Sequence, residues 1–248
     1  MQELPSIGSI ERIEPDFAEI VSDEARIEVL AQGYEWSEGP VWIESKEMLL
    51  FSDVPTNIIH QWQKNKGASE YLQPSGYTGT EPSKSREPGS NGLTLDNAGR
   101  LILCQHGDRR IARLESDLDK PEPSFVTIAD RYEGKRFNSP NDVVVRSNGD
   151  MFFTDPPYGL PNQENDSTKE IPFQGVYKIS AAGGVSLVVD SLTRPNGIAL
   201  TPDERTLIVA NSDPDKARWY AFELNEQDSV ISARIFYDAT EAGKSDKG

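Results

Sequence analysis

The sequence has few of the residues on which several common kinds of site depend. Its 248 residues include one cysteine, Cys104, and two histidines, His60 and His106. A single cysteine excludes an intrachain disulfide and a multi-cysteine zinc site, and two histidines exclude a multi-histidine zinc site. Cys104 ends the apolar run LILC, so we expect it in the core. No G-x-S-x-G motif is present, which leaves a serine nucleophile of the α/β-hydrolase type without support.

Basic residues and long apolar runs are also scarce. The chain has 25 Lys and Arg against 41 Asp and Glu, a formal net charge of −16 at pH 7. This charge disfavours nucleic acid and anionic membrane surfaces as partners, because both are bound through Lys and Arg. No apolar run is long enough for a spanning helix. The N-terminus has neither a basic start nor an apolar stretch, so no signal peptide is predicted. The cytoplasm is therefore the default location, although a longer precursor could be exported.

Four segments of the chain can be aligned as repeats, at residues 38–63, 91–115, 141–180 and 196–224. Each begins with a polar residue and continues as short strand, turn, second strand, polar loop and third strand. The turn sequences Asp-Asn-Ala-Gly, Ser-Asn-Gly-Asp and Thr-Pro-Asp-Glu suit tight hairpins. Successive repeats start about 50 to 55 residues apart, which is typical of propeller blades.

The repeat predicts an all-β fold in which each blade is a four-stranded antiparallel sheet. Residues 123–130 and 184–190 supply a fourth strand after the second and third repeats. About four blades can be counted, and a β-sandwich is the rival architecture. We expect residues 1–30 to form a cover segment, with a short helix near residues 10–22 and a strand over 25–33. Residues 31–248 would form the propeller, and the Gly-, Pro- and Ser-rich stretch 76–90 a long loop.

The first residues of the repeats suggest a shared site. In a propeller the innermost strand of each blade lines the central channel, so its first residue points into one mouth of that channel. Glu38, Asn91, Asn141 and Asn196 hold this position in successive repeats. Side-chain oxygens that converge in this way, one of them a carboxylate, are typical ligands of a hard cation such as Ca²⁺. The alternative for any one of these Asn residues is local bonding to the backbone, but their common register favours the cation site.

These motifs resemble the SMP-30/gluconolactonase/LRE-like family of six-bladed propeller lactonases. The resemblance rests on WSEGPVW (36–42), SNGLTLD (90–96), RFNSPNDVVVRSNGDMFFTDPPYG (136–159) and RPNGIALTPDERTLIVANSD (194–213). It implies a divalent cation, typically calcium, held by Glu38, Asn141 and Asn196. The family's fourth ligand, an Asp in a PDG-type motif, has no match, so we expect it beyond Gly248. The chain therefore resembles a C-terminally truncated member, and we expect it to bind calcium weakly.

The resemblance implies hydrolysis of a sugar lactone or a similar cyclic ester. A cation would polarise the carbonyl and activate water, and a general base would take the proton. His106 is the best titratable candidate for that base within this chain, although it could equally be a loop histidine bonded to the backbone. Asn91 and Arg136 are candidates for binding the substrate, and Arg136 could instead be a surface residue. The rival functions are a non-enzymatic propeller binding module and a calcium-dependent hydrolase of another ester or an organophosphate.

Overall fold

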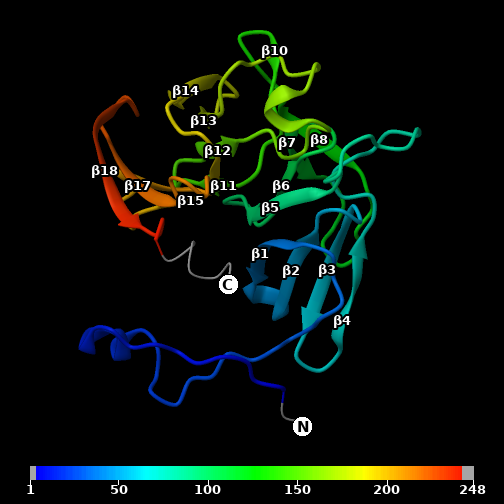
Figure 1. Cartoon of the computed structure of the whole chain (residues 1–248). Coiled ribbons are helices and arrows are strands. Elements are labelled where there is room, and N and C mark those ends of the chain that lie inside the picture. The colour runs from blue at the N-terminus through cyan, green and yellow to red at the C-terminus, as the bar shows by residue number, and fades with distance from the viewer. Residues whose placement is uncertain (1–3, 242–248) are drawn as a thin grey trace.

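The computed structural model describes residues 4–241, and nearly all of their regular structure is β (Figure 1). Four four-stranded antiparallel sheets follow one another along the chain, and in each sheet the strands pair in chain order. The sheets are arranged as the blades of a propeller, in an arc with sheet 1 at one end and sheet 4 at the other (Figure 1). The predicted all-β propeller is confirmed, whereas a total of six blades stays a prediction.

Each sheet corresponds to one sequence repeat and the strand that follows it. Sheet 1 consists of β1 (Ser37–Ile43), β2 (Met48–Asp53), β3 (Ile58–Gln63) and β4 (Gly67–Leu72). Sheet 2 consists of β5 (Ser90–Leu95), β6 (Leu101–Gln105), β7 (Arg110–Leu114) and β8 (Phe125–Ala129). Sheet 3 consists of β11 (Val143–Val145), β12 (Met151–Asp155), β13 (Gly175–Ile179) and β14 (Val185–Val189). Sheet 4 consists of β15 (Pro195–Leu200), β16 (Thr206–Asn211), β17 (Arg218–Leu224) and β18 (Val230–Asp238). The fourth strands predicted at 123–130 and 184–190 are thus confirmed as β8 and β14.

The core lies between neighbouring sheets, because each internal sheet buries both of its faces. Alternate residues of β6 show this: Leu101 and Leu103 pack toward sheet 1, whereas Ile102 and Cys104 pack toward sheet 3. The side chains of a strand alternate between its faces, so a continuous apolar run is what a sheet buried on both faces requires. Each fully buried Leu or Ile contributes roughly 1.5–3 kcal/mol. Cys104 is a core residue, as expected.

The innermost strands contact one another in the order β1, β5, β11 and β15. The remaining elements are short: η2 (Glu44–Lys46), the pair β9 (Arg131–Tyr132) and β10 (Lys135–Arg136), and η3 (Gln163–Asn165). Residues 76–89 form a loop without regular structure, as predicted. The side-chain oxygen of Asn57 accepts hydrogen bonds from the backbone N–H groups of Gly76 (2.7 Å) and Tyr77 (3.2 Å). These bonds fix the start of the loop against sheet 1.

The N-terminal segment contains one short helix, η1 (Pro15–Glu19), near the expected place. The strand expected over 25–33 is wrong. Only an isolated bridge between Ser6 and Glu28 forms there, and Ile27 is 46% exposed, so this alternating pattern has no apolar partner to bury it. The predicted division into 1–30 and 31–248 stays a prediction, and it includes residues 1–3 and 242–248, outside the described part of the chain. Within residues 4–241, no helix has the length and apolar character needed to cross a bilayer.

Candidate functional site

The predicted site residues lie at irregular starts of the inner strands. Register shifts, which mark β-bulges, occur between Glu38 and Val41, between Ser90 and Leu93, and between Pro195 and Ile198. In sheet 3 the backbone N–H of Asn141 donates to the carbonyl of Thr154 (2.8 Å), just before β11 begins. A bulge leaves residues unpaired and re-aims their side chains. Glu38, Asn91, Asn141 and Asn196 therefore occupy equivalent places in four successive sheets.

Glycines bring these places into backbone contact. Gly39 has a φ of +56°, and a Cβ there would lie 2.1 Å from the carbonyl oxygen of Asn91. A Cβ at Gly92 would lie 2.7 Å from the carbonyl oxygen of Asn141, to which the Gly92 N–H donates a hydrogen bond of 2.7 Å. No side chain fits at either contact. The segments that carry Glu38, Asn91 and Asn141 consequently lie against one another, although they are about 50 residues apart in sequence.

Asn141 and His106 meet in the interior. Asn141 is 1% exposed and His106 is fully buried, and the Asn141 Nδ2 lies 3.4 Å from the His106 Nε2. The other ring nitrogen, Nδ1, lies 3.4 Å from a carboxylate oxygen of Glu87 and has no hydrogen-bond partner among residues 4–241. Glu87 belongs to the long loop 76–89. The imidazole therefore lies between a carboxylate and the amide of Asn141, a contact that the sequence did not predict.

The carboxylate of Glu38 lies close enough to Asp142 for its negative charge to disfavour ionisation of Asp142. The indole N–H of Trp36 donates to Glu38 Oε1 (3.0 Å). Burial, together with the negative charge of Glu38, raises the pKa of Asp142 to about 6, against the opposing effect of hydrogen bonds from the Ile198 and Val143 N–H groups. The sequence reasoning overlooked Asp142. Its signal was the N-D pair of the third repeat, where the second and fourth repeats have N-G.

The second strand of every sheet ends in a polar residue, and in sheets 1, 3 and 4 this residue bonds to the segment before the inner strand. Asp53 accepts a hydrogen bond from the Trp36 N–H (2.9 Å), and Asn211 accepts one from the Arg194 N–H (2.7 Å). Asp155 accepts two hydrogen bonds, from the backbone N–H groups of Asn138 and Ser139 (2.8 Å each). Burial raises the pKa of Asp155 to about 7. The two hydrogen bonds and the positive charges of Arg109 and Lys169 oppose this rise. Each of these side chains holds the segment that leads into an inner strand.

The remaining predicted residues differ in their burial and in their contacts. Asn91 is buried, and Asn196 is half-buried at the start of β15. Arg136 lies in β10, where its guanidinium donates to the carbonyl of Asp108 (2.9 Å) and its N–H to Glu170 (2.8 Å). These bonds tie Arg136 to the loop after His106 rather than to the bulges. Its role in binding a substrate stays a prediction.

The donors at the bulges fit a divalent cation. In the described part of the chain, no group of three or more His, Cys, Asp or Glu side chains could hold a metal ion. The candidate donors are instead amides and one carboxylate. The Asn141 Oδ1 is buried and has no hydrogen-bond partner among residues 4–241. An unpartnered buried acceptor costs about 1–3 kcal/mol, and a cation would satisfy it.

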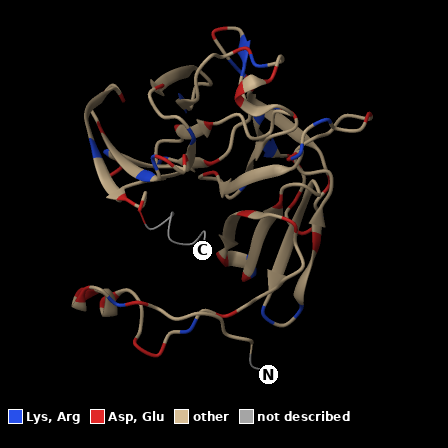
Figure 2. Ribbon diagram, viewed as in Figure 1, with Lys and Arg blue, Asp and Glu red and all other residues tan. Residues whose placement is uncertain are grey.

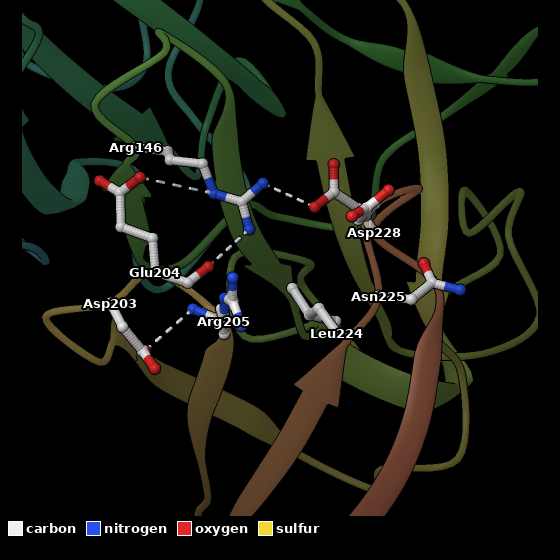
Figure 3. A pocket seen from close by; sticks show the side chains of 8 residues that line it. Arg146, Asp203, Glu204, Arg205, Leu224, Asn225 and Asp228 are labelled. Carbon is white, nitrogen blue, oxygen red and sulfur yellow. Dashed lines mark hydrogen bonds and ion pairs between the residues drawn. The ribbon is translucent and has the colours of Figure 1, made fainter.

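A different pocket, of about 400 Å³, lies at the opposite end of the inner strands (Figure 3). Arg146, which follows β11, forms an ion pair with Asp228 (2.6 Å) and donates to the carbonyl of Glu204 (2.9 Å). Lys178 pairs with the same Asp228 and with Asp150 (2.9 Å). These contacts join the turns of sheets 3 and 4. The charged side chains of this pocket pair with one another, and β11 lies between Arg146 and Asn141. This pocket is therefore separate from the candidate site.

The charged residues are distributed along the described part of the chain. Figure 2 shows Asp and Glu on the N-terminal segment and in all the sheets and their loops, with Lys and Arg interspersed.

Comparison with known proteins gives consistent relatives. A family model described as the SMP-30/Gluconolactonase/LRE-like region matches residues 36–246. The chain is 40% identical over 221 residues to a gluconolactonase of Zymomonas mobilis, covering 89% of this chain and 61% of that protein. It thus spans less than two thirds of the length of this curated relative.

Solved structures agree. A gluconolactonase of Xanthomonas campestris has a TM-score of 0.75 and 30% identity, over 95% of this chain and 71% of the other. A calcium-binding protein, regucalcin, of Agrobacterium tumefaciens has a TM-score of 0.61 and 15% identity, over 86% of this chain and 63% of the other. At that identity the likeness concerns the fold alone. Because the family model matches most of its length, the chain belongs to the SMP-30/gluconolactonase/LRE-like family.

Proposed function

We propose that this chain carries the cation-binding centre of a hydrolase of sugar lactones or similar cyclic esters. The observation that supports it best is the buried, unpartnered Oδ1 of Asn141, next to bulges that bring Glu38 and Asn196 to equivalent places. The gluconolactonase relatives support the substrate class. Glu38, Asn141 and Asn196 would hold the cation. We favour calcium, because amide and carboxylate oxygens in irregular arrangement suit it better than magnesium.

The chemistry that a divalent cation supplies at such a site is polarisation of a carbonyl oxygen and a lower pKa of water. The chain's own residues have three further tasks. Asn91 and Arg136 would donate hydrogen bonds to oxygens of the lactone. The imidazole of His106 would take the proton that water loses as its oxygen attacks the ester carbonyl. The ring C–O bond would then break, and the ring oxygen would take the proton back from His106, so the product is a hydroxy acid.

A lactonase assay tests this proposal. Hydrolysis of glucono-δ-lactone would be followed by acid release, before and after treatment with a chelator and after calcium is restored. Asn141→Ala removes one charge-assisted contact worth about 1.5–3 kcal/mol, so activity at limiting calcium should fall about 10- to 100-fold. Asn165→Ala is the matched control, because Asn165 is exposed in η3, and it should have no effect.

The outcomes separate the alternatives. Calcium-dependent turnover that Asn141→Ala lowers about 10- to 100-fold at limiting calcium supports the proposal. Calcium binding without turnover of the lactone, an aryl ester or a phosphotriester would favour a binding module instead. Turnover of only the aryl ester or the phosphotriester would favour the related hydrolase. Lactone hydrolysis that neither the chelator nor Asn141→Ala affects would overturn the role of the cation.

A further inference from the structure

Two buried hydroxyl groups connect neighbouring sheets at the candidate site. The Ser52 Oγ, in β2, donates to the carbonyl of Asn91 in the next sheet (2.9 Å). The Thr154 Oγ1, in β12, donates to the carbonyl of Asn196 in the next sheet (2.6 Å). Ser52 and Thr154 are fully buried, and each is the last residue but one of its strand. The two bonds, which we call inter-sheet hydroxyl bonds, are therefore equivalent features of different repeats.

Ser52 also contacts the Ser90 Oγ (2.8 Å) and pairs with Glu38 on its own sheet, and Thr154 makes comparable contacts with the segment that carries Asn141. Its Oγ1 also accepts a hydrogen bond from the N–H of Asp142 (3.2 Å). Its backbone carbonyl accepts the Asn141 N–H (2.8 Å), and its N–H donates to the Asp142 carbonyl (3.0 Å). One residue therefore fixes the backbone of Asn141 on its own sheet and that of Asn196 on the next.

We propose that Thr154 is a positioning residue that sets the spacing between Asn141 and Asn196, two of the residues that would hold the cation. This inference rests on the proposed function. Groups that orient metal ligands must hold them within about 0.5 Å of the working geometry. The hydroxyl spans the joint between sheets 3 and 4 and bonds directly to the backbone of Asn196, whereas the neighbouring bond across this joint, from the Ile198 N–H to Asp142 Oδ2 (3.0 Å), does not involve either amide residue. Ser52 acts in the same way on Asn91, which is a candidate for contact with substrate rather than cation.

Packing alone does not explain these hydroxyls. The equivalent residues of the other two sheets are Cys104 and Ala210, neither of which carries a hydroxyl. At the joint between sheets 2 and 3, the backbone bond from Gly92 N–H to the Asn141 carbonyl connects the strands. A buried sheet joint of this fold therefore forms without a hydroxyl at this position. The hydroxyl of Thr154 lies where two proposed cation ligands come from different sheets.

Terbium(III) binding provides a test that does not depend on activity. Terbium accepts the oxygen ligands that calcium uses, and Trp36, bonded to Glu38, would sensitise its luminescence. Three variants are compared with the unmodified chain: Thr154→Val, which keeps the shape without the hydroxyl, Thr154→Ser, which keeps the hydroxyl, and Ser52→Ala. Thr154→Ala is a second hydroxyl-free variant in case valine prevents folding. Urea unfolding in chelator measures the stability of each variant without a cation.

The proposal predicts a selective effect. Loss of the hydroxyl at Thr154 should weaken terbium binding by about 10- to 100-fold, the usual cost of removing a group that orients a ligand. Thr154→Ser should restore binding to within about threefold. Ser52→Ala should lose about as much stability as Thr154→Val, but its terbium affinity should stay within about threefold of that of the unmodified chain. Because Ser52 bonds to Asn91, this variant should also raise the KM for glucono-δ-lactone.

The results distinguish failure of the positioning role of Thr154 from failure of the proposed function. Terbium binding that the hydroxyl-free Thr154 variants weaken no more than Ser52→Ala overturns the positioning role and leaves the proposed function standing. Failure of Thr154→Ser to restore binding also overturns it. Absence of any terbium binding by the unmodified chain overturns the proposed function and the positioning role together.

Discussion

The ion pair between Arg146 and Asp228 should be a main contributor to the joint between sheets 3 and 4. Replacing Arg146 with Met keeps a long apolar side chain and removes the charge. The change breaks the 2.6 Å pair with Asp228 and removes the donor to the Glu204 carbonyl (Figure 3). It also ends the contact of the guanidinium with the Phe152 ring, at 4.8 Å from the ring centroid.

The structure sets the expected magnitude. Both side chains of the pair are 11% exposed, so solvent screens the interaction little. Removing one partner of a buried pair costs about 3–5 kcal/mol. Asp228 keeps Lys178 as a partner, which places Arg146→Met at the low end of that range. We therefore expect the free energy of unfolding to fall by about 3 kcal/mol, a large share of the 5–15 kcal/mol typical of a folded domain.

Urea unfolding followed by circular dichroism measures the change. Arg205→Met is the matched control, because Arg205 lines the same pocket but is exposed, and it should change stability by less than about 0.5 kcal/mol. A double-mutant cycle with Asp228→Asn should give a coupling energy of about 1–3 kcal/mol. A loss below about 1 kcal/mol for Arg146→Met, or additive effects in the cycle, would refute the assignment of this pair as a buried, stabilising contact.

Two further predictions concern groups beside the candidate site. The folded-state pKa of Asp155 is raised to about 7 from an ordinary value near 3.8, so the stability that its protonated form supplies is complete below pH 4 and is lost as the pH rises through 7. The urea midpoint of the unmodified chain should fall relative to that of Asp155→Asn over this range, and parallel pH profiles would contradict the burial argument. Gly92→Ala should destabilise the chain by about 1–3 kcal/mol, because its Cβ would lie 2.6 Å from Asp142 Oδ1. Gly184→Ala, at an exposed turn, is the control, and equal effects of the two would show that the contact at Gly92 is not tight.

The repeat made much of the fold predictable. Repeated short strands, separated by tight-turn sequences, predicted the positions of the four sheets. The common register of Glu38, Asn91, Asn141 and Asn196 predicted that they occupy equivalent places, and they do. The strand expected over 25–33 does not form because no sheet lies beside it, and only the bridge between Ser6 and Glu28 pairs there.

Contacts between sheets could not be predicted in the same way. Ser52, Cys104, Thr154 and Ala210 occupy one position of the repeat, yet their different chemistry concealed that two of them bond to the next sheet. The contact between His106 and Glu87 depends on a loop whose path no periodic pattern specifies. Asp142 was not predicted because the polar residue that recurs in every repeat is its neighbour, Asn141, whereas the other repeats have glycine at the position of Asp142.

Calorimetric titration of the chain with calcium tests the central claim most directly. The account predicts a single site whose affinity falls about 10- to 100-fold in each of Glu38→Gln, Asn141→Ala and Asn196→Ala, and stays unchanged in Asn165→Ala. Binding that survives all three changes, or a calcium site that only residues outside this set affect, would contradict it.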